Sequence, residues 1–320
     1  MVKSLIIGTG SYLPVHTLSN DDLAKTVDTN DQWIYQRTGI KNRHIAAETE
    51  LTSDLATHAL NNAIISAGIS ADDLDAIVLA TTTPDLIFPA TGVKVQHNIG
   101  MKHGFAFDVQ AVCSGFIYAL YLANIMIISG NVKKVAVVGA EIMSRIVNWK
   151  DRSTCVLFGD GAGAVILSAA TNLERRGILD AKLYSDGSLT DILKVNGGIA
   201  KGNLNAKIEM KGGEVFKRAV ERMSAMVVDL AHSHGYILAD LDWILPHQAS
   251  SRILDAMAEK LKIPLRKVMS TICNHANTGA ATIPLTLDHY VKTGQVKDGD
   301  LIALTAVGGG LTAACALLKL

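Results

Sequence analysis

The sequence has no excess of either charge and no ordered pattern of cysteines. Among its 320 residues, 30 are Lys or Arg and 30 are Asp or Glu, so no global field favours nucleic acid or a membrane as partner. The four cysteines, at positions 113, 155, 273 and 315, have neither the spacing of a metal site nor that of a disulfide framework. We therefore expect a protein without bound metal in a reducing, cytoplasmic setting.

Long apolar runs are also missing. No run approaches the length of a membrane span, and the apolar start, residues 1–8, is too short for a signal peptide and reads as a strand. A hydrophobic content of 49% with 19% charged residues predicts a compact chain with a large buried core. The length allows one large layered domain or two medium ones.

Two glycine-rich segments do not complete a nucleotide-binding motif. Residues 8–10 begin like a dinucleotide fingerprint, but Leu13 stands where the third glycine should be and Pro14 follows. The cluster at residues 159–163 lacks the Lys-Ser/Thr of a phosphate loop. We expect those glycines to permit close backbone packing instead.

Short apolar segments alternate with helical patterns along the whole chain. This alternation predicts parallel-type strands with helices on both sides. Strands are predicted at residues 1–8, 76–81, 105–109, 134–139, up to 168, 243–245, 301–305 and 313–318. Helices are predicted at residues 21–37, 53–68 with Thr52 or Ser53 as cap, 114–128, 214–233 and 250–261.

The two halves of the sequence resemble each other. Residues 73–77 (DLDAI) match residues 240–244 (DLDWI) at an offset of 167, and Gly68 and Gly235 end helices at the same offset. At an offset of 164, residues 113–115 align with residues 277–279. Two copies of a β-α-β unit explain these matches, so we expect two related halves, residues 1–170 and 171–320.

Three polar residues stand where these elements meet. Cys113 begins a predicted helix, whose N-terminus favours a thiolate, although a buried and inert cysteine is the simpler interpretation. The repeat places Asn277 at the start of the matching helix. His247 follows a strand and Pro246, at the carboxyl end where α/β proteins carry functional side chains. Cys, His and Asn could therefore converge.

Four ordered motifs now resemble one family, β-ketoacyl-acyl-carrier-protein synthase III. They are AVCSGF at residues 111–116, LPHQA at 245–249, HANTGA at 275–280 and GGG at 308–310, and the similarity extends along nearly the whole chain. The resemblance implies the α/β thiolase-like fold, in which two duplicated halves form five α-β-α-β-α layers.

The resemblance also implies an acyltransferase. Such an enzyme condenses a short acyl-CoA, here expected to be acetyl-CoA, with malonyl-acyl-carrier protein to start type II fatty acid synthesis, and acyl-CoA is a substrate rather than a cofactor. Cys113 would carry the acyl group, and its N–H with that of Gly309 would form the oxyanion hole. His247 and Asn277 would donate hydrogen bonds to the enolate formed by decarboxylation.

Further family positions concern the two substrates and the dimer. Trp33, Arg37 and Arg152 would hold the adenine nucleotide end of CoA, although packing and solvated charge would explain them equally well. Arg252 and Lys217 would meet the carrier protein, Phe88 would reach into the acyl pocket of the other protomer, and the protein would be a homodimer. The sequence departs from the family at residues 259–260, where a pair of lysines is replaced by Glu-Lys.

Several rival functions remain for comparison. A degradative thiolase needs a second cysteine where Ala306 stands, and elongating condensing enzymes carry histidine in place of Asn277. Plant-type polyketide synthases share the three residues but are usually longer. The main alternative is a paralogue that makes a specialised or signalling metabolite from another acyl starter, and the alternative of another class is a non-catalytic scaffold.

Overall fold

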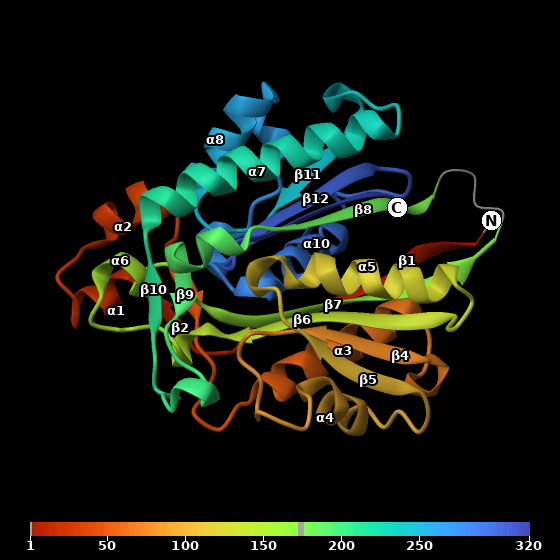
Figure 1. Ribbon diagram of the computed structural model, residues 1–320, viewed down its shortest axis with the longest axis horizontal. Helices are drawn as coiled ribbons and strands as arrows, with labels where there is room; N and C mark the ends of the chain where they lie inside the picture. The colour runs from red at the N-terminus through yellow and green to blue at the C-terminus, as the bar shows by residue number, and fades with distance from the viewer. Residues whose placement is uncertain (1, 172–175) are drawn as a thin grey trace.

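The computed structural model describes residues 2–171 and 176–320 and has five layers (Figure 1). One pair of helices covers the outer face of the first sheet, a second pair lies between the sheets, and a third covers the outer face of the second sheet. In that order the pairs are α3 (Thr52–Ala67) with α4 (Thr91–Asn98), α5 (Gly115–Ile128) with α10 (Thr282–Lys292), and α7 (Gly212–Ser233) with α8 (Ser251–Leu261). The expected α-β-α-β-α architecture is confirmed.

Each half supplies one of the two large sheets. The first has the order β1-β7-β6-β4-β5 and the second the order β8-β13-β12-β11. The first sheet contains β1 (Lys3–Tyr12), β7 (Asp160–Ala170), β6 (Lys134–Ile142), β4 (Ala76–Ala80) and β5 (Phe105–Val109). The second contains β8 (Gly177–Ser185), β13 (Thr312–Lys319), β12 (Leu301–Gly308) and β11 (Trp243–Pro246).

Both sheets are mixed, so the prediction of parallel-type strands throughout is wrong. Strand β4 is parallel to β5 and β6, and β11 is parallel to β12, but β7 and β13 are antiparallel to both of their neighbours. For β12 and β13 the reason is the connection at residues 309–311, which is too short for the crossover that a parallel pair requires.

The sheets repeat each other in order and direction except at one edge. Where β5 pairs with β4 in the first sheet, the second sheet has only an isolated parallel bridge between Ile244 and Val268. Within residues 2–171 and 176–320, β5 therefore has no strand counterpart in the other half.

The middle layer forms the deepest part of the core. Helix α5 is apolar around its circumference: Phe116, Ile117 and Leu120 are fully buried, whereas other apolar residues of this helix remain exposed. The glycines at residues 159–163 allow β7 to approach α10, because a Cβ on Gly163 would lie 2.6 Å from the backbone nitrogen of Leu285. The expected packing role of this cluster is confirmed.

Three local predictions need correction. The single helix expected at residues 21–37 is two helices, α1 (Asn20–Ala24) and α2 (Asp31–Thr38), because the Asn30 side chain accepts a 2.8 Å hydrogen bond from the Trp33 N–H and starts α2 afresh. Helix α3 has Leu51, not Thr52 or Ser53, at its N-cap. Strand β8 occupies a stretch that the sequence left unassigned.

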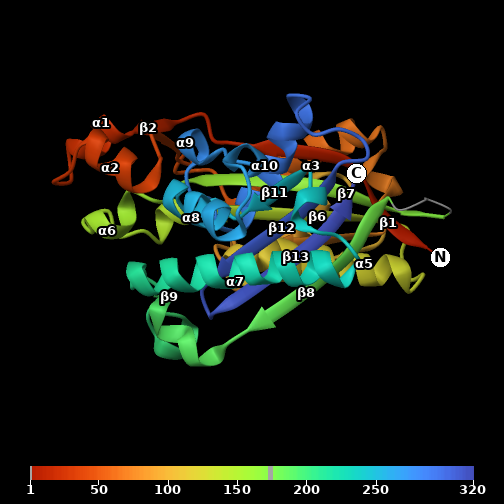
Figure 2. The same cartoon turned by 90° about the horizontal axis from the view of Figure 1, so that it is seen from above.

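Smaller elements gather at one end of the layers (Figures 1 and 2). They are β2 (Thr17–Ser19), β3 (Asn42–His44), α6 (Arg152–Cys155), β9 (Leu193–Val195), β10 (Ile208–Met210) and α9 (Ile272–His275). No helix in the described parts of the chain has the length and apolarity needed to cross a membrane.

Candidate active site

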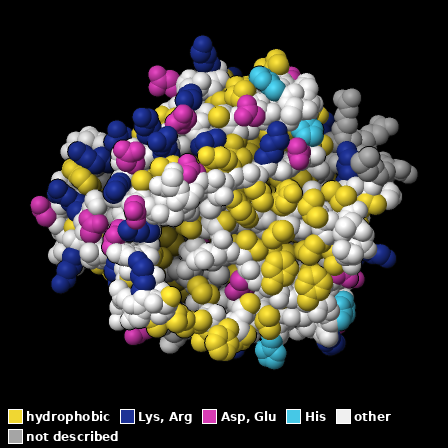
Figure 3. All heavy atoms as spheres, viewed as in Figure 1, with side chains coloured by type: hydrophobic (Ala, Val, Ile, Leu, Met, Phe, Trp, Pro, Cys, Tyr) yellow, Lys and Arg dark blue, Asp and Glu magenta, His cyan; other side chains and the backbone are white. Residues whose placement is uncertain are grey.

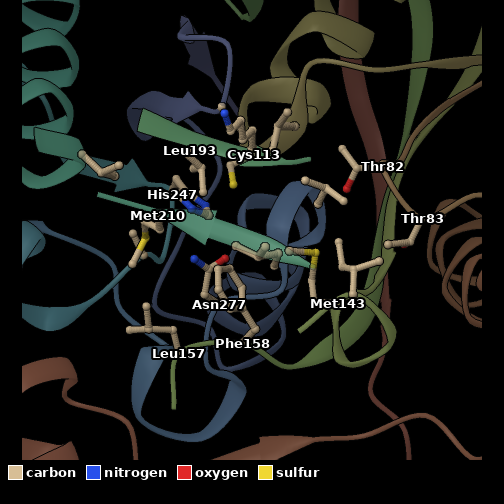
Figure 4. A pocket seen from close by; sticks show the side chains of 18 of the residues that line it. Thr82, Thr83, Cys113, Met143, Leu157, Phe158, Leu193, Met210, His247 and Asn277 are labelled. Atoms are coloured by element: carbon tan, nitrogen blue, oxygen red, sulfur yellow. The ribbon is translucent and has the colours of Figure 1, made fainter. Parts of the chain in front are cut away.

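A cavity of about 1220 Å³ lies at the end of the molecule where these smaller elements gather, and residues of α6, β9 and β10 line it. Its walls include loops that follow the carboxyl ends of β4, β5, β11 and β12, the edge at which α/β proteins place ligands. Cys113, His247 and Asn277 all line it and all are buried. Figure 4 shows the Cys113 sulfur, the His247 ring and the Asn277 amide around one common space.

Cys113 lies in a short 3-10 turn, η2 (Val112–Ser114), directly before α5. The turn is fixed to the β12–β13 hairpin of the other half, since the Ser114 hydroxyl lies 2.8 Å from that of Thr312. A Cβ on Gly308 would lie 2.7 Å from the Cys113 nitrogen, so only glycine fits there. Gly309, the next residue, also lines the cavity.

Cys113 is buried, and burial opposes the thiolate that a helix N-terminus favours. Burial, with a smaller contribution from the charge of Glu141, raises the pKa of the Cys113 thiol to about 12. Desolvation disfavours the charged form more strongly than the start of one helix favours it.

His247 is oriented by two hydrogen bonds from different elements. Its backbone N–H donates to the Thr305 carbonyl at 2.8 Å, and its ring Nδ1 lies 2.7 Å from the hydroxyl oxygen of Thr282. Burial lowers the pKa of His247 to about 3, so the imidazole is neutral. The sequence analysis did not identify Thr282, whose position five residues after Asn277 was the only available signal.

The backbone of Asn277 is hydrogen-bonded to residues 157 and 159 of the first half of the chain. Its backbone N–H donates to the Leu157 carbonyl at 2.9 Å, and its carbonyl accepts from the Gly159 N–H at 3.1 Å. The side-chain Oδ1 accepts from the Gly279 N–H at 3.0 Å. Because Oδ1 is engaged in this way, the Nδ2 group is the part of the amide left to donate to a bound molecule.

The internal repeat is preserved in the backbone of the site. Val112 has φ 49° and Ala276 has φ 56°, and these residues immediately precede Cys113 and Asn277 at the same offset of 164. Positive φ is unusual for any residue with a side chain and rarer still for a β-branched one. The two halves therefore use the same bend to present Cys113 and Asn277.

The three residues expected to hold CoA lie together at the mouth of the cavity. Trp33 and Arg37 line it, and the Arg37 guanidinium lies 4.4 Å from the centre of the Trp33 ring. The Arg152 guanidinium lies 4.9 Å from the same ring and is also bound to the Asp28 carbonyl at 2.8 Å. One aromatic ring thus carries two exposed cations.

The remaining expected residues lie at the rim or outside. Arg252 lines the cavity, with its guanidinium 5.9 Å from the Phe216 ring, while the exposed Lys217 follows Phe216 on α7. Phe88 is 82% exposed and is not among the residues that line the cavity of its own chain, whereas Ile87 is. In the described residues, no group of three or more His, Cys, Asp or Glu side chains is arranged to hold a metal ion.

Comparison with known proteins gives consistent matches over the full length. Family models described as 3-oxoacyl-[acyl-carrier-protein (ACP)] synthase III and its C-terminal part match residues 107–187 and 231–320. A Wolbachia pipientis wMel protein named beta-ketoacyl-[acyl-carrier-protein] synthase III is 52% identical, covering 99% of each chain, and its Paramagnetospirillum magneticum namesake is 51% identical over 100% of each. The crystal structure of 3-oxoacyl-[acyl-carrier-protein] synthase III from Aquifex aeolicus VF5 superposes with a TM-score of 0.94 at 46% identity, covering 99% of this chain and 100% of that one.

Proposed function

Because the chain belongs to the 3-oxoacyl-[acyl-carrier-protein] synthase III family, we propose that Cys113, His247 and Asn277 carry out the family reaction in it. The protein is an acyltransferase that condenses a short acyl-CoA with malonyl-acyl-carrier protein, with loss of CO₂, and so initiates type II fatty acid synthesis. Sequence identity of 51–52% to these synthases over the full length favours this function over a specialised paralogue or a scaffold.

In the first half-reaction Cys113 accepts the acyl group. Its Sγ attacks the thioester carbonyl of acyl-CoA, the carbon–sulfur bond to CoA breaks, and the thiol proton leaves with CoA. The carbonyl oxygen is stabilised by the N–H groups of Cys113 and Gly309. Each donor of this kind lowers the activation barrier by about 3–4 kcal/mol. Glycine at position 308 supports this role because a Cβ there would lie 2.7 Å from the Cys113 nitrogen.

In the second half-reaction His247 and Asn277 act on malonyl-acyl-carrier protein. Decarboxylation places negative charge on the thioester oxygen, and Nε2–H of His247 with Nδ2–H of Asn277 donate to it. The enolate carbon then attacks the acyl-Cys113 thioester and the bond from the acyl carbon to Sγ breaks. This releases 3-ketoacyl-carrier protein, and Sγ takes up a proton from solvent to restore the thiol. The neutral imidazole and the amide fixed by Gly279 support this step, which requires no metal or organic cofactor.

Substrate binding follows from the charges around the mouth. Trp33, Arg37 and Arg152 bind the adenine and phosphate groups of CoA by stacking and charge-assisted hydrogen bonds. Arg252 and Lys217 contact the acidic carrier protein at the rim. The Glu-Lys pair at residues 259–260 supplies no second positive charge there.

We further propose that the protein is a homodimer built through one apolar patch. The patch is defined by the exposed side chains of Phe88, Phe105, Leu122, Ile125 and Ile128, which lie on β5, on α5 and in the loop between β4 and α4. Figure 3 shows hydrophobic side chains gathered over this face. An exposed apolar surface of this kind is typical of an interface, and it would deliver Phe88 to the partner. Division into halves at residues 1–170 and 171–320 is consistent with one sheet in each.

The observation that carries the proposal is the convergence of Cys113, His247 and Asn277 in one cavity. Mixing the protein with acetyl-CoA should give a single acyl adduct by intact mass, and Cys113→Ser should give none. Branched and medium-chain CoA in the same assay identify the starter. Absence of an adduct with every acyl-CoA would overturn the proposal. Comparing malonyl-carrier protein with malonyl-CoA as acceptor separates fatty acid initiation from the paralogue.

A further inference from the structure

Glu141 is a fully buried carboxylate that the proposed reaction does not use. It is the penultimate residue of β6 and belongs to the first half of the chain. Buried carboxylates are rare unless they are hydrogen-bonded, because water no longer stabilises the charge. Its contacts therefore indicate what it does.

One set of contacts fixes a wall of the cavity. The backbone N–H of Thr82 donates to Oε1 at 3.1 Å, and the hydroxyls of Thr82 and Thr83 donate to Oε2 at 2.9 and 2.7 Å. The Thr83 hydroxyl in turn accepts from the Ile142 N–H at 2.9 Å. Thr82 and Thr83 line the cavity beside Cys113 (Figure 4), so the carboxylate holds the loop after β4 in place.

A second set reaches the other half of the chain. The Ala280 N–H donates to the Glu141 carboxylate, and a Cβ on Gly279 would lie 2.9 Å from the Glu141 Cγ. Gly279 is the residue whose N–H orients the Asn277 amide. Glu141 thus supports the turn that directs Asn277, while Thr82 and Thr83 are held by the same carboxylate.

The negative charge of Glu141 affects the ionisation of the Cys113 thiol. Its hydrogen-bond donors in the loop 81–83 and in η8 (Gly279–Ala281) are all uncharged, and the ionisable group facing it from η2 is Cys113. On the neighbouring strand β7, Asp160 pairs with Ile142 rather than Glu141 and so points to the opposite face of the sheet. Burial, partly offset by the hydrogen bonds, raises the pKa of Glu141 to about 7, and its charge contributes to the raised pKa of Cys113.

We propose that Glu141 is a positioning residue of this site, which fixes Asn277 and the Thr82–Thr83 wall around the nucleophile and whose negative charge restrains ionisation of the Cys113 thiol. The first role rests on the proposed function, whereas the second concerns the thiol alone. The restraint keeps the free enzyme in the thiol form, which protects it from adventitious alkylation and oxidation.

Glu141→Gln tests the charge while keeping the shape. The rate of Cys113 alkylation by iodoacetamide is measured from pH 5.5 to 9 by peptide mass for the variant and the wild type. The ratio of the two rates should be near one below about pH 6 and rise to about ten above about pH 8, because removal of a nearby like charge lowers a pKa by about one unit. Asp288→Asn is the matched control, since Asp288 is another buried carboxylate bound by residues of the first half, Thr9 among them. A ratio that does not change with pH would overturn the electrostatic role.

Glu141→Asp tests the reach while keeping the charge. Its alkylation profile should follow the wild type, but its shorter side chain cannot hold both walls. Condensation with malonyl-carrier protein should therefore fall about tenfold further than formation of the acyl adduct. Equal losses in the two steps would overturn the positioning role. Alkylation uses no acyl substrate, so failure of wild-type acylation would reject the proposed function without deciding this inference.

Discussion

The Nδ1 atom of His247 lies 2.7 Å from the Thr282 hydroxyl oxygen, which in turn lies 3.2 Å from the carbonyl oxygen of Gly279. A hydroxyl carries one proton, so it donates either to Nδ1 or to Gly279. In the first case Nε2 of His247 carries the ring proton and can donate to an enolate; in the second Nε2 is a proton acceptor. Thr282 therefore decides which tautomer faces the cavity.

We expect Thr282→Val to impair condensation more than acylation. Valine has nearly the same shape but leaves Nδ1 without a partner, and an unsatisfied buried polar group costs about 1–3 kcal/mol. Condensation should fall about 10- to 100-fold, whereas rapid-quench measurement of the acyl adduct should show a smaller change. Thr282→Ser should restore most of the activity. Equal losses in both steps, without rescue by serine, would show that Thr282 serves packing only.

Asn277→Ala should separate the two half-reactions in the same direction. The variant keeps Cys113 and the oxyanion donors, so the acyl adduct should form at a rate within about threefold of the wild type. Loss of one donor to the enolate should reduce decarboxylating condensation about 10²- to 10³-fold. Asn203→Ala, in the same cavity, is the control and should slow neither step as much as Asn277→Ala slows condensation. A variant that loses acylation instead would contradict the assigned role.

Phe105→Lys should weaken self-association. Phe105 is 45% exposed on the edge strand β5, and a lysine there places charge in the apolar patch and opposes strand pairing. Sedimentation velocity should show a shift from dimer to monomer at micromolar concentration. Ile65→Lys changes an equally apolar side chain, 75% exposed, on α3 and should leave the dimer intact. A dimer that survives Phe105→Lys would place the interface elsewhere.

Acid should destabilise the fold through His247. Its folded pKa, about 3, lies below the ordinary value of 6.5, so between these values the unfolded chain binds a proton that the folded chain does not. Stability is therefore lost as pH falls below about 6.5, at about 1.4 kcal/mol per pH unit for this group. His275, with a pKa lowered to about 4, acts in the same direction, and Glu141, with a pKa raised to about 7, opposes both.

Urea unfolding at pH 7, 6 and 5 measures this contribution by comparison with His247→Gln. The glutamine variant should lose stability less steeply than the wild type, by about 1.4 kcal/mol for each unit between pH 6 and 5. Parallel curves for the two proteins would mean that His247 is protonated in the folded state.

Local patterns in the sequence predicted much of the fold and the identity of the central residues. The amphipathic pattern located α7 closely, and the apolar segments at α5 and β5 were also placed closely, β5 at both of its ends. The repeat and the motifs led to Cys113, His247 and Asn277, which line one cavity. Strand direction was misjudged because apolar content reports burial and not the direction of the neighbouring strand.

What the sequence missed depends on contacts between distant residues. The predicted strand at residues 134–139 ended before Glu141. The hydrogen bond between Glu141 and Thr82 joins residues 59 positions apart in the sequence. Nothing in the local sequence marks Thr282 as a site residue, although its hydroxyl is hydrogen-bonded to His247, 35 residues away. The raised pKa of the Cys113 thiol could not be predicted, because helix position is local, whereas desolvation depends on the whole surrounding fold.

The two sheets differ at one edge, where β5 lies beside β4 and no strand lies beside β11 in the described residues. Strand β5 offers an open edge, while the matching position beside Ile244 is closed by the Val268 bridge. Had the second half kept a strand there, each chain would present two equivalent edges, and pairing could pass from chain to chain as in a growing filament. In the proposed dimer, pairing through β5 would use this edge, and no matching strand beside β11 would be left to bind a third chain.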